Sequence, residues 1–201
     1  MNRRIKAIST VAVAGMALTG CSLSINEHDD AKPFPGMSNM MGNNAKTGLN
    51  NADVMFLQGM IPHHQQAIDM SKVVPTHSKN AEVIALATKI QAAQQPEIDE
   101  MNKWLSDAGQ SSSMGGMDMG DMGGMGMMTD GEMTALDAAN GNAFDKLFLS
   151  GMITHHEGAV RMAKAIIANG QDLRVRNLAT NILTGQTAEI EQMKAMLAAL
   201  K

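Results

Sequence analysis

The chain has 201 residues, a formal net charge of -4 at neutral pH, and a composition that is 44% hydrophobic but only 2% aromatic. This mild acidity argues against a nucleic-acid partner, and the single cysteine excludes both an internal disulfide framework and a thiolate metal cluster. The 21 methionines are the unusual feature of the composition.

The first 20 residues are typical of a bacterial lipoprotein signal peptide. Three basic residues precede an apolar run at 7–17 that is too short to span a bilayer. The sequence LTGC follows and resembles a lipobox, so cleavage before Cys21 would leave a lipidated cysteine at the mature N-terminus. An ordinary secretory signal is the alternative. Either interpretation predicts export, to the periplasm or the cell surface.

Beyond the signal peptide, the chain divides into a tether, two similar halves and a linker. The tether is rich in Asn, Asp, Gly and Pro and lacks an apolar period, so we expect it to be disordered. The expected parts are a disordered tether at 21–52, a helical hairpin at 53–109, a Met/Gly-rich linker at 110–131, and a short helix plus a second hairpin at 132–201.

The duplication is visible as a constant offset of 92 residues. Residues 53–105 align with 145–197 without a gap, and 21 of the 53 positions are identical. In each copy, two apolar stripes at the i, i+3, i+4, i+7 spacing predict two helices of roughly 20 residues. Pro75 and Gly109 are expected to end the helices of the first copy, and Gly170 the first helix of the second copy.

Two such hairpins can bury their apolar faces by packing together. We therefore expect an all-α fold, a ferritin-like antiparallel four-helix bundle. The linker is long enough to cross the bundle, and residues 132–139 are predicted to form a short helix after it. Pro62 and Pro96 lie within helical patterns, where they are expected to cause kinks.

A pattern of methionines and histidines occurs once in each copy. FLQGMIPHHQQAIDMSK at 56–72 returns as FLSGMITHHEGAVRMAK at 148–164. On a helix, these side chains lie on one side, with the histidines astride the apolar stripe. Because an unpartnered imidazole in a core is costly, the two equivalent pairs favour metal binding over a purely structural polar network. The candidate ligands are Met60, His63, His64, Met70, Met152, His155, His156 and Met162.

The second helix of each copy carries a glutamine, a glutamate and a methionine on its core face. A carboxylate there needs a partner, and the facing histidines can supply it. The glutamates are expected either to accept a ring N–H, which leaves the other nitrogen for metal, or to ligate directly. These supporting or direct-ligand candidates are Gln94, Glu97, Met101, Gln186, Glu189 and Met193. The histidines without a counterpart, His28 and His77, are expected on the surface.

Thioether and imidazole donors together favour copper(I) or silver(I), whereas zinc usually takes three or four His, Cys or carboxylate ligands. The linker region adds eight methionines between Met114 and Met133, set among Gly, Ser and Asp. Oxidisable thioethers bring no packing benefit to a solvated segment. A disordered reservoir that collects soft ions explains them, and drift in a low-complexity loop is the alternative.

The repeated pattern also resembles a known family. D-x-x-F-x-x-x-M-x-x-H-H-x-x-A-x-x-M, followed by L-A-x-x-I-x-x-x-Q-x-x-E-I-x-x-M, is similar to the bacterial domain of unknown function numbered three hundred and five. The resemblance implies a ferritin-like bundle that is usually exported, and some similar proteins are periplasmic copper-binding proteins linked to copper tolerance. It places the family's histidine pair and flanking methionines at the eight candidate ligands. Membership alone leaves the activity open.

We therefore expect an exported lipoprotein that binds copper(I) or silver(I) for sequestration, tolerance or delivery, with iron and zinc less favoured. No enzymatic activity and no catalytic residue are predicted. Its partners would be the membrane, through lipid on Cys21, metal ions and other envelope copper-handling proteins. A di-metal iron oxidoreductase is one alternative, although Met60 and Met152 stand where such centres use glutamate. A structural envelope module without metal is the other.

Overall fold

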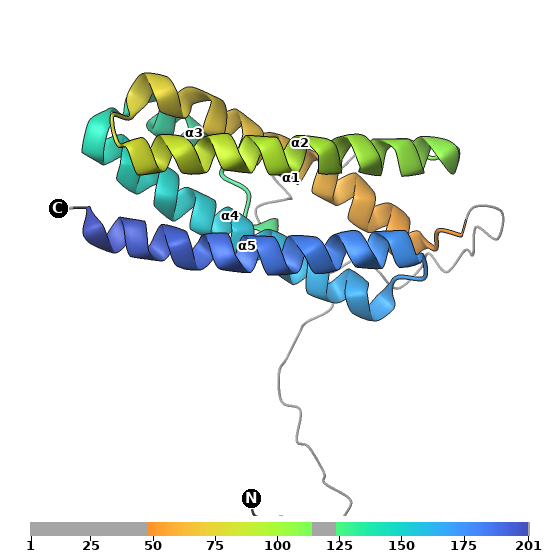
Figure 1. Cartoon of the computed structure of the whole chain (residues 1–201). Helices are drawn as coiled ribbons and strands as arrows, with labels where there is room; N and C mark the ends of the chain where they lie inside the picture. The colour runs from red at the N-terminus through yellow and green to blue at the C-terminus, as the bar shows by residue number, and fades with distance from the viewer. Residues whose placement is uncertain (1–47, 114–123, 201) are drawn as a thin grey trace, which may run out of the picture. The chain divides into compact units, whose positions relative to one another are not determined.

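In the computed structural model, the described residues, 48–113 and 124–200, form five helices and no strand. This confirms the predicted all-α fold. The signal sequence, Cys21, His28 and the methionines at 114, 117, 119 and 122 lie outside the described residues. No described helix is both long and apolar enough to cross a membrane. The helices are α1 (Asn51–His77), α2 (Ala81–Asp107), α3 (Asp130–Ala138), α4 (Gly141–Asn169) and α5 (Leu173–Ala199) (Figure 1).

Polar side chains cap most of the helix starts. Asn50 accepts a hydrogen bond from the Asp53 amide, and the Asp53 carboxylate accepts one from the Asn50 amide, which completes a capping box before α1. Thr129 and Glu132 form the same motif before α3. α3 therefore matches the predicted short helix, and its start is set by local sequence.

The four long helices have 27 to 29 residues, so the predicted length of roughly 20 was too short. Apolar stripes mark only the buried turns, whereas the caps lie beyond them. Pro75 does not end α1, which continues to His77, because one missing backbone donor near a helix end is tolerated. Gly109, with φ of 65°, follows α2, and Gly170 is the C-cap of α4, as predicted.

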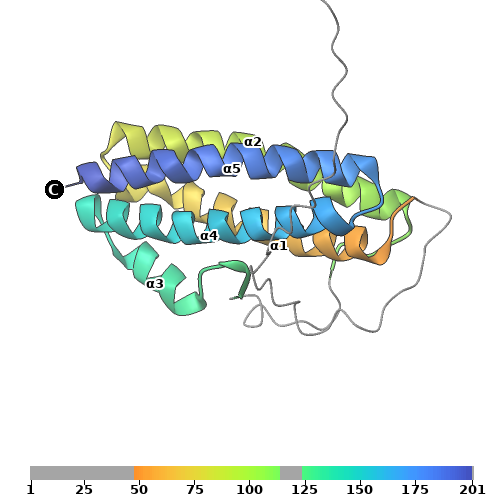
Figure 2. The ribbon, with the colours of Figure 1, turned by 90° about the horizontal axis from the view of Figure 1, so that it is seen from below.

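Contacts between the helices define an antiparallel four-helix bundle. α1 packs on α2, α4 packs on α5, and α1 with α4 forms the main contact between the hairpins. Ring contacts from His63 to His155 and from His77 to Phe144 show that α1 and α4 run in opposite directions. The connection from α2 to α4 must therefore run the length of the bundle, as in ferritin-like topology. Figure 2 shows α3 beside α4 and α1.

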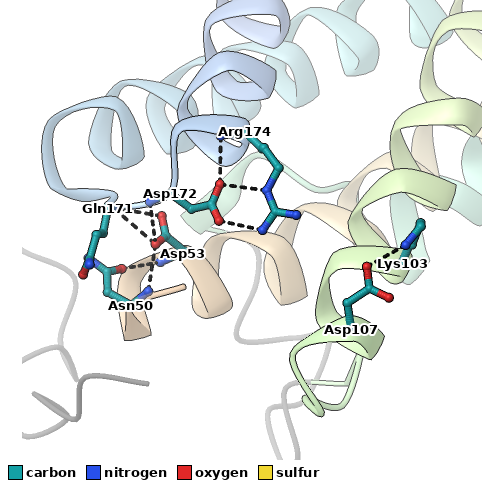
Figure 3. A network of polar contacts seen from close by, with 7 residues as sticks. All are labelled: Asn50, Asp53, Lys103, Asp107, Gln171, Asp172 and Arg174. Atoms are coloured by element: carbon teal, nitrogen blue, oxygen red, sulfur yellow. Dashed lines mark hydrogen bonds and ion pairs between the residues drawn. The ribbon is translucent and has the colours of Figure 1, made fainter. Parts of the chain in front are cut away.

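Asp53 joins the two hairpins at one end of the bundle. Besides capping α1, its buried carboxylate accepts hydrogen bonds from the main-chain amides of Gln171 and Asp172, each at 3.2 Å (Figure 3). Asp172 caps α5 and pairs with Arg174, and the bond from Arg174 holds the pKa of Asp172 below its ordinary value. The equivalent acid of the second copy, Asp145, has one carboxylate oxygen without a hydrogen-bond partner among the described residues.

Two segments that were predicted to be loops are packed against the bundle. Leu49, within the predicted tether, is 1% exposed, and Met127, within the predicted linker, is 7% exposed. Burying such a side chain is worth about 1.5–3 kcal/mol, which is enough to hold a short segment. The expectation of a solvated side chain was therefore wrong for Leu49 and Met127.

Candidate metal centre

A polar layer separates two apolar clusters of the core. On α2, α4 and α5, residues of one cluster lie toward one end and residues of the other lie toward the opposite end, with polar side chains between them. α1 follows the same order apart from Ile68. The histidines are fully buried, and both glutamines are at most 4% exposed. Buried polar groups of this kind are costly unless they find partners. The layer consists of His63, His64, Gln94, Glu97, His155, His156, Gln186 and Glu189.

The second histidine of each pair bonds to a glutamate on the neighbouring helix. His64 Nε2 lies 2.7 Å from Glu97 Oε2, and His156 Nε2 lies 3.0 Å from Glu189 Oε2. The predicted pairing is confirmed. Because a carboxylate accepts, Nε2 carries the proton and the lone pair is on Nδ1. Neither Nδ1 atom has a hydrogen-bond partner in the described part of the chain.

The first histidines of the two pairs meet each other. The ring centroids of His63 and His155 are 3.7 Å apart, with the planes tilted by 37°. His63 Nε2 donates to the main-chain oxygen of Met125 at 3.0 Å. Neither ring nitrogen of His155 is hydrogen-bonded within the described residues. The sequence left open which histidines face inward, and the structure places all four in the core.

Burial keeps three of these rings, His63, His155 and His156, neutral near physiological pH. Burial, followed by the charge of His64, lowers the pKa of His63 to about 3. Burial also holds the pKa of His155 well below its ordinary value. The His63 main chain has the smallest influence on this pKa and raises it. The pKa of His156 is lowered by burial although its bond to Glu189 raises it. Neutral imidazole is the form that binds metal.

The two glutamates of the layer have different surroundings. Lys89 Nζ lies 3.3 Å from Glu189 Oε1, and the Glu189 side chain is 9% exposed against 24% for Glu97. Burial would raise the pKa of Glu189, but the bond from His156 and the Lys89 charge keep it below its ordinary value. The position equivalent to Lys89 is Asn181, so the two copies have diverged here.

The buried glutamines have no hydrogen-bond partners among the described residues, at either amide atom. The candidate methionines are also buried, three in each apolar cluster, so thioethers flank the polar layer on both sides. One cluster holds Met60, Met101 and Met162, and the other holds Met70, Met152 and Met193.

The end of the linker is fastened over the histidines by residues that the motif did not reveal. We call residues 124–129 the strap. The Gln66 side chain makes two hydrogen bonds, each 2.8 Å, with the main chain of Met128. On α4, Gly158 allows the strap to approach, since a Cβ there would overlap the Met125 main-chain oxygen. Gln66 and Gly158 occupy equivalent positions of the repeat but are different residues. This difference between the copies was the sequence signal that could have pointed to the strap.

His77 is partly buried, which corrects the prediction of a surface residue. Its ring stacks on Phe144 at 5.1 Å between centroids, and its Nδ1 donates to the Ala139 main-chain oxygen at 2.8 Å. The prediction failed because α1 continues past Pro75 and carries His77 onto α4. It lies at the end of α1, well away from the polar layer.

The donor chemistry of the layer fits a soft monovalent ion. Each unpartnered buried lone pair costs about 1–3 kcal/mol, which a bound cation would recover. The described residues contain no group of three or more His, Cys, Asp or Glu side chains suited to hold a metal. A nitrogen and oxygen donor set of the zinc type is therefore not preformed in this part of the chain, whereas buried thioethers lie on both sides of the layer.

Two solved structures share this fold over most of the chain. A Streptomyces coelicolor DUF305 protein, described as secreted, is 33% identical with a TM-score of 0.68, over 73% of this chain and 92% of the other. A DUF305 fragment from Deinococcus radiodurans is 30% identical with a TM-score of 0.71, over 76% of this chain and 99% of the fragment.

The protein CopM is also similar and was solved in metal-bound forms. Its copper(I)-bound form is 32% identical with a TM-score of 0.60, over 72% of this chain and 94% of CopM. Its copper(II)-bound form is 35% identical with a TM-score of 0.64, over 73% and 95%. Silver-bound and apo forms match as well.

Sequence comparison gives a shorter match and a family. The uncharacterized protein L153 of Acanthamoeba polyphaga mimivirus is 47% identical over 55 residues, which are 27% of this chain and 36% of that protein. The match thus spans about a third of that relative. The family model described as domain of unknown function DUF305 matches residues 53–197. With the repeated histidine pairs and the bundle, this match shows that the chain belongs to the DUF305 family.

Proposed function

We propose that this protein is an exported, lipid-anchored, non-enzymatic binder of copper(I) or silver(I) that sequesters the ion or passes it on outside the cytoplasm. The observation that carries the proposal is the polar layer, where four buried histidines present Nδ1 atoms that have no partner among the described residues. The similarity to metal-bound CopM supports the choice of ion. The N-terminal sequence and the secreted relative support export.

The ion would be held by the histidines of the layer together with the flanking thioethers. Glu97 and Glu189 orient two of the rings and raise the basicity of the opposite nitrogen. Because burial holds the pKa of His63 at about 3, that ring needs no deprotonation at neutral pH. The surrounding apolar clusters favour a weakly hydrated monovalent ion over a strongly hydrated divalent one. The ligands proposed from this set are His63, His64, His155 and His156 with Met60, Met70, Met152 and Met162.

The Met-rich segment at 114–123 has a separate proposed role, which is to collect ions for the folded site. To test this role, its four methionines are changed to serine together. We expect the number of bound copper(I) ions to fall while the tightest site remains. Unchanged stoichiometry would leave the segment as a connector only.

The main test is titration of the reduced, metal-free protein with copper(I) against a competing chelator, followed by native mass spectrometry. A variant with His63, His64, His155 and His156 changed to Leu should lose the tight site. The matched control is His77→Leu, a partly buried histidine outside the layer. Circular dichroism checks that the variants fold, and single His64→Leu and His156→Leu variants cover the case in which the quadruple variant does not.

Three results would contradict the proposal. Unchanged copper(I) uptake in the folded quadruple variant would place binding outside the layer. Iron retained through purification, with an oxygen-dependent visible absorption, would favour a di-metal oxidoreductase. If no metal binds at all, the polar layer serves only to position the helices.

A further inference from the structure

We propose that the strap is a positioning element of the metal centre. The Met125 main-chain oxygen holds His63 in its Nε2–H tautomer, so that Nδ1 is the metal-binding nitrogen, and His155 is left as the ring that can ligate through either nitrogen. This inference rests on the proposed function, because it describes how the same site is arranged. Its tautomer component can be tested without any metal.

Hydrogen-bond chemistry assigns the tautomer of His63. A main-chain carbonyl oxygen only accepts, so the contact of 3.0 Å between Met125 O and His63 Nε2 requires the proton on Nε2. In a neutral ring, the lone pair is then on Nδ1, which has no partner in the described part of the chain. His64 and His156 reach the same tautomer through their glutamates. Three rings thus offer Nδ1.

The strap is held in place by contacts that do not involve His63. Gln66 bonds both the amide and the carbonyl of Met128, and Met127 is buried against the bundle. Gly126, with φ of 86°, turns the chain where a Cβ would lie 2.5 Å from the Thr154 main-chain oxygen. The Met125 carbonyl is therefore fixed before it meets the imidazole, and the ring adapts to the strap.

The strap also removes the equivalence of the two copies. It bonds to the Gln66 side chain on α1 and packs against Gly158 on α4, although these are equivalent positions of the repeat. Only one of the two central rings, His63, receives a carbonyl from it. The strap offers no such contact to His155, and neither nitrogen of that ring has a hydrogen-bond partner within the described residues. A single crossover thus gives the two central histidines different roles.

The experiment uses metal-free protein labelled with ¹⁵N in its histidines and studied above pH 7. Long-range ¹H–¹⁵N spectra distinguish the protonated from the bare nitrogen of a neutral ring, and a His63→Gln variant assigns the signal. We expect His63 to be an Nε2–H ring. Gly158→Ala displaces the strap, and Gln66→Ala removes two of its hydrogen bonds. In both, His63 should become a mixture of tautomers.

Silver(I) affinity provides the second measurement. Loss of a group that orients a metal ligand typically costs 10–100-fold in affinity, so we expect about a 10-fold loss in Gly158→Ala and Gln66→Ala. The matched controls are Gly185→Ala, where a Cβ meets no described atom within 4 Å, and Gln65→Ala, which removes only a surface bond to Asp69. Neither control should change the tautomer or the affinity.

The outcomes separate the inference from the proposed function. An Nδ1–H ring at His63 in the wild-type protein, or an unchanged tautomer and affinity in both folded strap variants, would overturn the positioning role. If one variant fails to fold, the other decides. The predicted tautomer in a wild-type protein that takes up no silver(I) would instead overturn the proposed function and leave the strap-to-ring contact standing.

Discussion

At the scale of single residues, the buried histidines make stability depend on pH. The unfolded chain takes up protons near the ordinary histidine pKa of about 6.5, whereas His63 stays neutral in the fold down to about 3. The stabilisation that comes from keeping these rings neutral is therefore fully present above pH 6.5. The free energy of unfolding decreases as the pH falls below that value. Each such ring adds up to about 1.4 kcal/mol per pH unit. Glu189, whose pKa is lowered, adds to this loss only at lower pH.

Urea unfolding of the metal-free protein, followed by circular dichroism from pH 7.5 to pH 5, measures this slope. His63→Leu should make the slope shallower by about one proton. A slope that is the same in wild type and His63→Leu would mean that His63 is protonated in the fold.

The unpartnered glutamines lead to a second residue-scale prediction. Since neither amide atom of Gln94 or Gln186 has a partner among the described residues, replacing both residues by Leu removes a desolvation penalty. We expect the metal-free protein to gain about 1 kcal/mol in its free energy of unfolding. Gln95→Leu, an exposed neighbour bonded to Asp99, is the control and should change it by less than about 0.5 kcal/mol. A loss on replacing Gln94 and Gln186 would show that their amides are bonded in solution.

At the scale of elements, the equivalent residues Asp53 and Asp145 are expected to make different contributions to the free energy of unfolding. Asp53→Ala removes a helix cap and the acceptor of two loop amides between α4 and α5, a loss of about 2–3 kcal/mol. Asp145→Ala should cost less, because one of its oxygens already lacks a partner in the described residues and α4 has no side-chain cap bond. Denaturant midpoints of the two variants compare them directly, and equal losses would contradict the asymmetry.

Helix type was predictable from the apolar stripes, but helix ends were not. The stripes locate α1, α2, α4 and α5, because they record which turns face the core. α1 continues through Pro75, and the rest of its last turn is held by packing of His77 on Phe144 from the second copy. That contact depends on a partner 67 positions away in the chain, so no local pattern contains it.

At the scale of the whole molecule, the hairpins should depend on each other. His63 and His155 meet across the interface of α1 and α4, and both apolar clusters contain residues of all four long helices. We expect the separate fragments 48–113 and 124–200 to be weakly helical, since each alone exposes half of a shared core. Mixing them should restore helicity in circular dichroism. A fragment that unfolds cooperatively alone would contradict this.

The sequence by itself determined the helical class, the duplication and the identity of the buried polar residues. It did so because helical periodicity and a gapless offset of 92 residues are local or repeated features. The pairing of Glu97 and Glu189 with histidines followed from the same reasoning, since a carboxylate on a core face needs a partner.

Only the tertiary structure decided how the two copies differ. The contact of the strap with His63, the Lys89 ammonium beside Glu189, and the loop amides on Asp53 join segments that are distant in sequence. In a perfect repeat, equivalent residues of the two copies would have the same contacts. A single crossover, however, can lie on only one side of the bundle. That geometric fact makes the central histidines inequivalent, and it belongs to the folded chain alone.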